Sequence, residues 1–252
     1  MPKSSMLPRP AATLILSRDT ACGLQVFLMQ RTQHAVFLPG FFVFPGGAVD
    51  PMDASETMLA LCKGTDNAKG SPILNMEQGG LAYKIAAIRE SFEEVGLLLA
   101  ENRSGEYIEI AEPGDVEYYA GLRERLNAGQ LTLADVCRQR DLSAAVDKLA
   151  FFSHWITPVG LPRRYDTRFF VAAAPERQTA VPDGQEAIDH IWIAPAEALK
   201  RGRRGEFPLS PPTMLTLREL ASFETTAALI NYARRPRQDC QSQKRCAAQV
   251  QP

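Results

Sequence analysis

The chain has 252 residues, of which 45% are hydrophobic and 23% charged, so it can bury a sizeable core. Its formal net charge of -1 provides no general basic surface for nucleic acid or an anionic membrane. No apolar run approaches the roughly 20 residues of a membrane-spanning helix, and five scattered cysteines without a C-x-x-C pair do not suggest a secreted disulfide framework. We therefore expect a soluble, unprocessed globular protein of the reducing cytoplasm.

The N-terminal part contains strand-forming segments. Residues 1–10, rich in Pro and Ser, are expected to form a flexible lead-in. Ala12–Ser17 and Leu24–Arg31 are rich in β-branched and aromatic residues, and the sequence DTACG between them favours a hairpin turn. Phe41–Phe44 predicts a third strand, which should end at Pro45 because proline lacks an amide donor. The two glycines that follow predict a sharp loop that a ligand can approach.

The rest of the chain alternates helical and strand patterns. Residues 50–80 are rich in turn formers and are expected to be an insertion or a lid, with one or two helical turns around SETMLALC. Helical periodicity then runs from Leu81 to about Leu99. The later predictions are helices in PGDVEYYAGLRERLNAG and LTLADVCRQRD, strands at Leu149–Thr157, Thr167–Ala173 and Ile188–Ala194, and helices at PAEALKRG and from Pro212 to about Tyr232. The pattern indicates one α+β domain at 11–232 and a disordered tail at 233–252.

The predicted helix after residue 80 has an acidic face. Its spacing places Glu90, Glu93 and Glu94 at i, i+3 and i+4, so the three carboxylates lie on one side. Like charges at this spacing destabilise a helix unless something neutralises them. Mg²⁺ or Mn²⁺ would do so, because these hard cations take carboxylate oxygens and water as ligands. The alternative is a solvated face of a surface helix.

Neighbouring residues favour the metal site. Arg89 precedes the acidic set, Gly96 follows it, and FPGG at Phe44–Gly47 stands upstream at a strand end. FPGG with RESFEEVGL resembles the Nudix box, whose pattern is G, five residues, E, seven residues, R-E-U-x-E-E-x-G-U. The resemblance implies the Nudix fold, a mixed β-sheet sandwiched between α-helices. It also implies that Gly46 or Gly47 begins the box.

The resemblance assigns roles to the residues that match the box. Glu90, Glu93, Glu94 and Gly46 would form the metal site. Glu93, Glu90 and Arg89 would belong to the catalytic machinery, and Gly47 would approach the substrate.

The sequence departs from the box in two places. Counting back from Arg89 puts Leu81 where the first box glutamate is expected, so that glutamate is either missing or supplied by the insertion, with Glu56 or Glu77 as candidates. Ser91 also replaces the usual aliphatic residue. A long insertion here, together with AIRESFEE, resembles the subgroup of the peroxisomal coenzyme A diphosphatases of animals. SHWITP, PRRYDTRFF and the W-I-x-P-x-E-A-L stretch are similar to that subgroup too, so the resemblance covers most of residues 11–232.

Four arginines are candidate substrate ligands. Arg31, ahead of G-x-x-x-F-P-G-G, resembles an element of coenzyme A-cleaving relatives, although Met29 and Val36 depart from it. The alternative for Arg31 is a surface charge at a strand end. The other three, Arg163, Arg164 and Arg168, surround a turn, and guanidinium groups bind phosphate oxygens in bidentate fashion. The alternative is local pairing of Asp166 with Arg164 or Arg168, which would fix the start of the strand.

Glu186 is a candidate additional catalytic acid, as a metal ligand or general base, and Asp183 and Asp189 compete for that role. His154 and Trp155 lie on a predicted core strand and receive no role.

The sequence therefore predicts a metal-dependent Nudix hydrolase, in which a metal-activated water attacks one phosphorus of a diphosphate. Coenzyme A or acyl-CoA would give 3',5'-ADP and phosphopantetheine or its acyl form. The alternatives are a diphosphatase for another nucleoside diphosphate derivative, such as ADP-ribose, a dinucleotide, NADH or capped RNA, and a non-catalytic nucleotide sensor. The expected partner is a small nucleoside diphosphate; nucleic acid and membrane are not expected, and a homodimer is compatible with these features.

Overall fold

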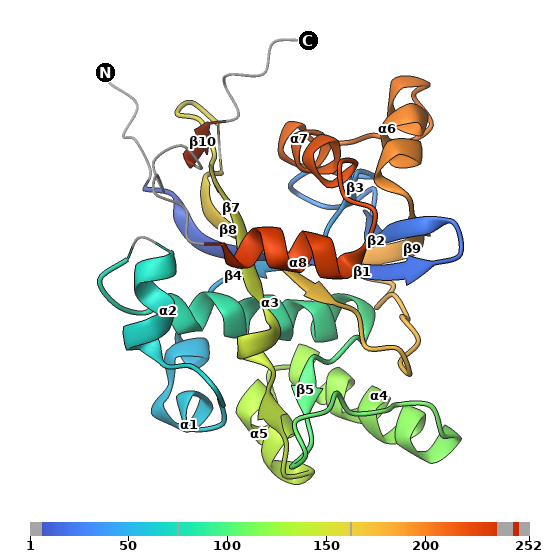
Figure 1. The fold of residues 1–252 in the computed structure, drawn as a ribbon. Coiled ribbons are helices and arrows are strands. Elements are labelled where there is room, and N and C mark those ends of the chain that lie inside the picture. Colours follow the sequence, from blue (N-terminus) through green and yellow to red (C-terminus); the bar gives the residue numbers. More distant parts are fainter. Residues whose placement is uncertain (1–6, 75, 162, 236–243, 247–252) are drawn as a thin grey trace.

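The computed structural model describes residues 7–74, 76–161, 163–235 and 244–246. Its strands are β1 (Arg9–Thr20), β2 (Gly23–Arg31), β3 (Phe42–Val43), β4 (Gly46–Ala48), β5 (Ala100–Glu101), β6 (Ser143–Ala144), β7 (Ala150–Ile156), β8 (Tyr165–Ala173), β9 (Ala187–Ile193) and β10 (Lys244–Cys246). The main sheet has the order β10-β7-β8-β1-β2-β3, with β4 also paired to β1 and β9 to β2. β1 runs parallel to β8 and antiparallel to β2, so the sheet is mixed (Figure 1).

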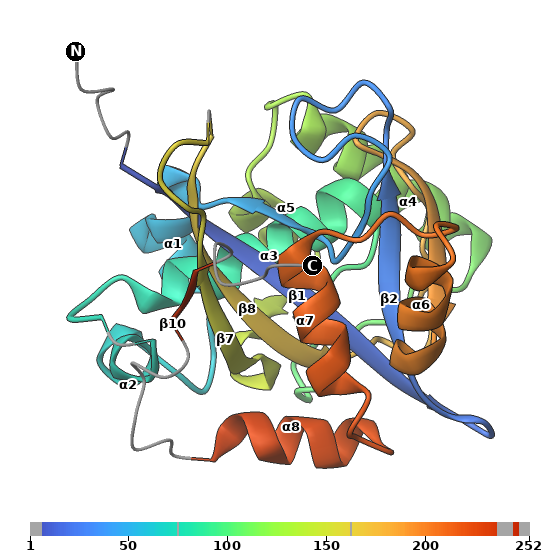
Figure 2. The ribbon, with the colours of Figure 1, turned by 90° about the horizontal axis from the view of Figure 1, so that it is seen from above.

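The helices are η1 (Pro51–Ala54), α1 (Glu56–Leu59), α2 (Asn67–Ile73), α3 (Gly80–Val95), α4 (Pro113–Asn127), α5 (Leu133–Gln139), η2 (Val146–Lys148), α6 (Pro195–Arg203), α7 (Pro211–Leu220) and α8 (Thr226–Arg234). In Figure 1, α1, α2, α4 and α5 gather in the lower half, whereas α6 and α7 lie at the upper right. Figure 2 shows α8 along one side of the molecule, close to α7. This arrangement confirms the predicted α+β class.

Side chains alternate between the two faces of the central strand β1. Leu14 and Leu16 pack in one core with Ile85 and Ile88 of α3. Ile15 between them packs in a second core with residues of α7 and α8, such as Leu217. All of these side chains are almost fully buried, because successive residues of a strand point to opposite faces. The sheet is therefore covered by helices on both faces.

The expected hairpin between the first two strands is present. Gly23 has a φ of +101°, a backbone angle that favours glycine, and the Thr20 hydroxyl donates to the Gly23 carbonyl oxygen at 2.9 Å. The loop predicted after Pro45 instead contains β4, which pairs with β1 at Ala11–Thr13. Pairing with a distant strand is a tertiary effect, which the local glycine signal does not reveal. Both glycines of FPGG therefore belong to a strand of the main sheet.

Helix α3 is shorter than the periodicity predicts. It ends at Val95 because Gly96 adopts a left-handed φ of +73°, with its amide bonded to the Phe92 carbonyl and the Leu97 amide bonded to the Ser91 carbonyl. The apolar residues 97–99 remain buried, but outside the helix. Because these apolar residues continue the sequence pattern of the helix, the periodicity predicted a helix longer than the observed one.

The insertion at 50–80 packs on the start of α3. The turns around SETMLALC are confirmed as α1, whereas α2 is not predicted by the sequence pattern. The first amides of α3 need external acceptors, and α2 supplies them. Ser71 Oγ accepts from the Gly80 amide at 3.0 Å, and Asn67 Oδ1 accepts from the Leu81 amide at 3.1 Å. The segment thus caps the acidic helix.

The single helix expected from Pro212 to about Tyr232 is two helices, α7 and α8. Thr225 caps α8 by accepting a bond from the Ala228 amide, and Asp19 Oδ1 near the end of β1 accepts from the Thr226 amide at 2.7 Å. This contact joins residues far apart in sequence, so periodicity alone could not locate the break. The prediction was therefore wrong at this point.

Both predicted flexible termini fall mainly outside the described residues. Within the described part, β1 begins at Arg9, α8 continues to Arg234, and β10 pairs in parallel with β7. None of the described helices combines the length and the apolar character that spanning a bilayer requires.

Candidate functional site

The acidic face of α3 rests on the glycine strand β4. Glu94 is 3% exposed, and its Oε2 accepts a hydrogen bond from the Gly46 amide at 2.8 Å. Gly47 has no room for a side chain, because a Cβ there would lie 2.5 to 2.6 Å from the Glu90 carboxylate. A Cβ at Gly46 would lie 2.3 Å from the Ala12 carbonyl oxygen. Gly46 therefore allows β1 and β4 to approach each other, and Gly47 leaves the space that the Glu90 carboxylate occupies.

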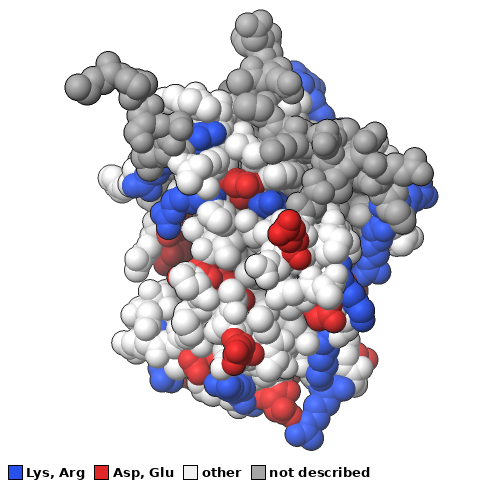
Figure 3. Space-filling view, turned by 90° about the vertical axis from the view of Figure 1, so that its left-hand side faces the viewer, with Lys and Arg blue, Asp and Glu red and all other residues white. Residues whose placement is uncertain are grey.

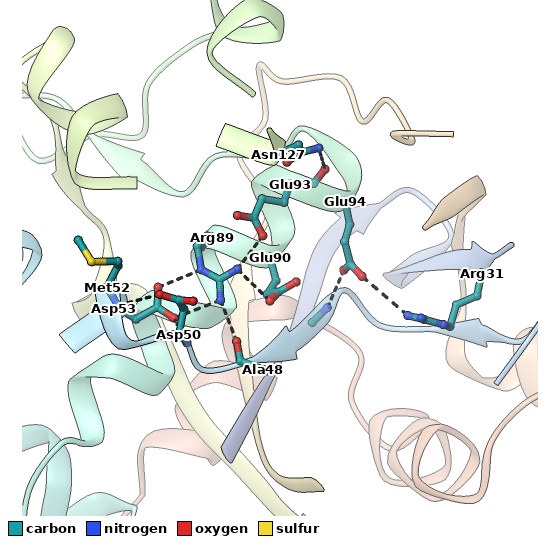
Figure 4. Close-up of polar contacts among 11 residues, drawn as sticks. Arg31, Ala48, Asp50, Met52, Asp53, Arg89, Glu90, Glu93, Glu94 and Asn127 are labelled. Carbon is teal, nitrogen blue, oxygen red and sulfur yellow. Dashed lines mark hydrogen bonds and ion pairs between the residues drawn. The ribbon is translucent and has the colours of Figure 1, made fainter. Parts of the chain in front are cut away.

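Arg89 gathers carboxylates at the other end of this contact (Figure 4). Its Nη1 donates to Glu90 Oε1 at 2.9 Å and to Glu93 Oε2 at 2.6 Å. Its Nε and Nη2 donate to the two oxygens of Asp53 at 3.0 and 3.1 Å, and Nη2 also donates to the Ala48 carbonyl oxygen at 2.8 Å. The guanidinium group therefore links β4, η1 and the acidic helix.

Asp53 is a site residue that the sequence interpretation missed. Counting forward from Gly47 by five intervening residues reaches Asp53, at the place of the first box glutamate. The insertion follows this acid, so counting back from Arg89 pointed wrongly to Leu81. Glu56 and Glu77, the candidates for the missing acid, are exposed, and Asp53 is the acid that binds Arg89. The sequence did contain a signal for this residue, namely an acid separated from Gly47 by five residues, as in the Nudix box.

Burial dominates the electrostatics of the acidic face. Desolvation raises the pKa of Glu90 to about 7, against the opposing charge of Arg89. It also raises the pKa of Glu93, and it raises the pKa of Glu94 well above its usual range, with the charge of Glu90 adding to the effect. Burial likewise raises the pKa of Asp53, although Arg89 opposes this shift. A cation close to these carboxylates would favour their ionised forms.

The donor set fits a hard divalent cation, although the side chains are not arranged around one. Glu94 Oε1 is buried without a hydrogen-bond partner, so one carboxylate oxygen remains available to a ligand. Glu90 and Glu93 converge instead on Arg89. Across the described residues, no group of three Asp, Glu, His or Cys side chains is placed to hold a metal ion. Holding one would require the Glu90 and Glu93 carboxylates to turn away from Arg89.

Arg31 lies next to Glu94, at the end of the acidic face away from Arg89 (Figure 4), and Glu186 lies next to Arg31. Arg31 Nη1 lies 3.9 Å from Glu94 Oε1, and Nη2 lies 3.7 Å from Glu186 Oε2. Arg31 Nε also donates to the Phe37 carbonyl oxygen at 3.0 Å, which fixes the guanidinium group at the end of β2. The structure therefore brings Arg31, predicted as a substrate ligand, next to two acids predicted as site residues.

The two competitors of Glu186 have other surroundings. Asp183 Oδ1 accepts hydrogen bonds from the amides of Gln185, Glu186 and Ala187, so its carboxylate shapes the loop. Asp189 lies on β9 and accepts from the His190 amide. Glu186 is the member of this group that reaches Arg31, and its side chain is 63% exposed.

A cleft of about 860 Å³ adjoins the acidic helix and has the size of a small-molecule site. Its lining includes Arg31, Gly46, Gly47, Glu90 and Glu186. Several apolar and aromatic residues line it as well, among them Val36, Phe37, Val43, Phe44, Trp155, Ile156, Leu161 and Phe169. Trp155, to which the sequence assigned no role, is thus a cleft residue.

The three downstream arginines separate in space. Arg163 is exposed and lines the cleft. Arg164 is outside the lining, and its Nε donates to the Thr157 carbonyl oxygen at 3.1 Å. Arg168 is 6% exposed, pairs with Asp166 at 2.9 Å, and lies 4.3 Å above the ring of Tyr83. Local pairing, the alternative interpretation, therefore describes Arg168.

His154 pairs with Asp166 through its Nε2 and does not line the cleft. Asp166 thus contacts a histidine of β7 and an arginine of β8, two strands that pair with each other.

Comparison with known proteins places the chain in a family. A family model described as the NUDT19 Nudix domain matches residues 6–220. The protein named acyl-coenzyme A diphosphatase NUDT19 from Homo sapiens is 30% identical over 237 residues, or 82% of this chain and 63% of the relative. The protein of the same name from Xenopus laevis is 30% identical over 229 residues, or 79% and 60%. The chain spans less than two thirds of these curated relatives.

Among solved structures, a NUDIX hydrolase from Alicyclobacillus acidocaldarius matches with a TM-score of 0.73 and 27% identity. The match covers 89% of this chain and 96% of that chain. The Nudix fold and the resemblance to the coenzyme A diphosphatase subgroup, both expected from the sequence, are confirmed.

Proposed function

The chain belongs to the NUDT19 Nudix domain family, and from this premise we propose that it is a metal-dependent hydrolase of a diphosphate bond. The preferred substrate is coenzyme A or acyl-CoA, cleaved with water to 3',5'-ADP and phosphopantetheine or its acyl form. One observation supports the proposal most strongly. The glutamates of α3 meet the glycine strand β4 beside a cleft that Arg31 and Glu186 also line.

Glu90, Glu93 and Glu94, with the backbone of Gly46, would hold Mg²⁺ or Mn²⁺. Nudix hydrolases generally use a divalent metal. Carboxylate oxygens are the ligands that these hard cations prefer, and Glu94 Oε1, which is buried and accepts no hydrogen bond, supports this assignment. When bound, the cation neutralises charge on the diphosphate and lowers the pKa of a bound water.

The chain's own residues then bind and orient the diphosphate. Arg31 and Arg163 line the cleft and can donate hydrogen bonds to phosphate oxygens. The charge of Arg31 also offsets that of Glu94 and Glu186. Glu186 is exposed beside the metal-binding glutamates and is the proposed general base that accepts a proton from the attacking water. Gly47 lines the cleft, where its backbone can approach the substrate, and its lack of a side chain leaves room for the Glu90 carboxylate.

Two observations support an acylated coenzyme A as the substrate. The relatives from Homo sapiens and Xenopus laevis are named as acyl-coenzyme A diphosphatases. The cleft also has an apolar rim, since Val36 is 75% exposed and Leu161 is 50% exposed, and both line it. Exposed apolar side chains at a cleft entrance suit an aliphatic chain, whose burial between them is favourable.

The nearest alternative keeps the reaction and changes the substrate to ADP-ribose, a dinucleotide, NADH or capped RNA. Turnover of ADP-ribose equal to that of coenzyme A would favour it. The other alternative is a sensor that binds a nucleotide without cleaving it. Tight binding of coenzyme A with no turnover in Mg²⁺ or Mn²⁺ would favour the sensor.

The central test is Glu93→Gln, which keeps the shape of the side chain and removes its charge. We expect hydrolysis of coenzyme A in Mg²⁺ to fall by about a thousandfold, while the folded state is retained. Glu124→Gln on α4, an exposed glutamate, is the matched control and should keep wild-type activity. Product release should also stop when EDTA is added. Full activity of Glu93→Gln would refute the proposal.

Partner and location remain predictions. The face shown in Figure 3 carries both Lys and Arg and Asp and Glu in its described part, and the formal net charge of the whole chain is -1. A small nucleoside diphosphate therefore stays the proposed partner. Light scattering of the purified protein would test the homodimer, and imaging of the tagged protein in cells would test the cytoplasmic location.

A further inference from the structure

Helix α4 reaches the acidic helix through the side chain of Arg123. Arg123 Nε donates to the Glu93 carbonyl oxygen at 3.0 Å, and Nη1 donates to the Val181 carbonyl oxygen at 2.7 Å. Asn127 Nδ2, one turn further along α4, donates to the same Glu93 carbonyl at 3.2 Å. That carbonyl belongs to the last turn of α3, where carbonyl groups lack partners within the helix. Arg123 therefore ties the end of α3 to the segment at Val181.

Val181 is followed by the loop that carries Glu186. Two backbone bonds join this loop to α3: the Val181 amide donates to the Val95 carbonyl at 2.9 Å, and the Asp183 amide donates to the Glu94 carbonyl at 3.0 Å. The Asp183 carboxylate then accepts the Glu186 amide at 3.0 Å. These hydrogen bonds, joined by the short backbone segments 94–95 and 181–183, thus connect Arg123 to the backbone of Glu186.

The residues around Arg123 leave space for its guanidinium group and provide backbone acceptors for it. Gly96 leaves space for the guanidinium group, since a Cβ there would lie 3.3 Å from Arg123 Nη1. Both bonds of Arg123 go to backbone carbonyl oxygens, whose positions are set by the fold rather than by a rotamer. Arg123 is not among the residues that line the cleft, so any effect on the reaction must pass through the loop.

We propose that Arg123 is a positioning residue, which locks the loop of Glu186 against the end of α3 so that Glu186 faces Arg31 and Glu94. The role of Glu186 in this inference rests on the proposed function. The lock itself is a property of the fold. Without it, the exposed Glu186 side chain would move with its loop and lose its fixed place beside the acidic helix.

The lock is tested first without any reaction, by hydrogen–deuterium exchange of the full chain. Arg123→Met removes the donors and keeps the aliphatic stem, and Arg125→Met on the same helix is the control, because the Arg125 side chain is exposed. We expect exchange at residues 181–187 to rise about tenfold in Arg123→Met and to stay unchanged in Arg125→Met. Unchanged exchange at 181–187 would overturn the lock, as would faster exchange spread evenly over the sheet.

The functional half is tested by a double-mutant cycle with Glu186→Gln. We expect Arg123→Met to lower kcat for coenzyme A about tenfold with little change in KM, and to add almost nothing in the Glu186→Gln background. Arg123→Lys, which can reach one carbonyl at most, should fall between the wild type and Arg123→Met. If the reductions in kcat of the two single variants multiply in the double variant, Arg123 acts independently of Glu186. That result would overturn the positioning role.

The two tests separate failure of this inference from failure of the proposed function. A wild-type chain that cleaves no diphosphate would refute the proposed function and, with it, the catalytic half of the inference. The exchange result would still decide whether Arg123 locks the loop. Activity in the wild type with independent losses at Arg123 and Glu186 would refute the positioning role alone.

Discussion

Arg89 and Asp53 form a two-point ion pair, with Nε on Oδ1 at 3.0 Å and Nη2 on Oδ2 at 3.1 Å. Asp53 is 2% exposed, and its Oδ2 also accepts the Asp50 amide at 2.8 Å, which holds the turn of η1. The pair therefore connects the acidic helix to the chain directly before the insertion. It lets a long segment enter between the first box acid and the box arginine without separating them in space.

Loss of this pair should destabilise the protein. In Asp53→Asn, Arg89 keeps its charge in a buried place and loses one of its ionised partners while Glu90 and Glu93 remain, so we expect the free energy of unfolding to fall by about 2 kcal/mol. Urea unfolding followed by circular dichroism measures this change. Glu56→Gln, three residues further along the chain, is the control, because that glutamate is exposed. A midpoint for Asp53→Asn equal to that of the wild type would show that the pair is dispensable.

A side chain at Gly47 should disturb the acidic face directly. The Cβ of Gly47→Ala would lie 2.5 to 2.6 Å from the carboxylate of Glu90, so that carboxylate must move. We expect kcat for coenzyme A to fall about a hundredfold, because small displacements of site groups cost this much. Gly121→Ala on α4 meets no atom within 4 Å and should leave kcat unchanged. Wild-type kcat in Gly47→Ala would contradict the close approach.

The apolar rim predicts a preference for acylated substrates. Val36→Ser and Leu161→Ser together remove the exposed apolar side chains from two sides of the cleft. We expect the ratio of kcat/KM for a long-chain acyl-CoA to that for free coenzyme A to fall about tenfold, which corresponds to roughly 1.5 kcal/mol of lost apolar contact. Val116→Ser, an exposed valine on α4, should leave the ratio unchanged. A constant ratio in the double variant would place the acyl chain elsewhere.

The buried Lys84 predicts how stability depends on pH. Its Nζ donates to the Val146 carbonyl oxygen at 2.9 Å, and burial lowers its pKa from 10.5 to about 8. The unfolded chain therefore binds more protons than the folded chain between these values, so the cost of burying the ammonium group is present below about pH 8 and is relieved as pH rises. We expect the unfolding free energy of the wild type, relative to Lys84→Met, to rise by about 3 kcal/mol across this window.

Urea unfolding at several pH values from neutral to about pH 10.5 measures the Lys84 effect. The same series on Lys69→Met provides the control, because Lys69 is exposed on α2. A flat difference between the wild type and Lys84→Met over the whole window would show that Lys84 titrates normally.

The sequence by itself determined the features that depend on local order. The spacing of Glu90, Glu93 and Glu94 places them on one helical face whatever the rest of the fold does, because a helix turns about 100° per residue. The strands, the hairpin turn at Gly23 and the glycine pair before the insertion follow from backbone preferences that act over a few residues. The resemblance to the Nudix box therefore follows from the order of the amino acids alone.

Only the tertiary structure decided which distant residues meet that helix. Asp53 and Arg31 come from separate segments and contact α3, and Glu186 from a third segment contacts Arg31; these meetings depend on how β1, β2 and β9 pair. Arg123 reaches the end of α3 from a helix whose sequence shows only ordinary amphipathic spacing. Arg168, one of three similar arginines, turns to Tyr83 because strand register sets the face on which a side chain lies. Such contacts arise from chain folding over long separations, which local sequence patterns do not encode.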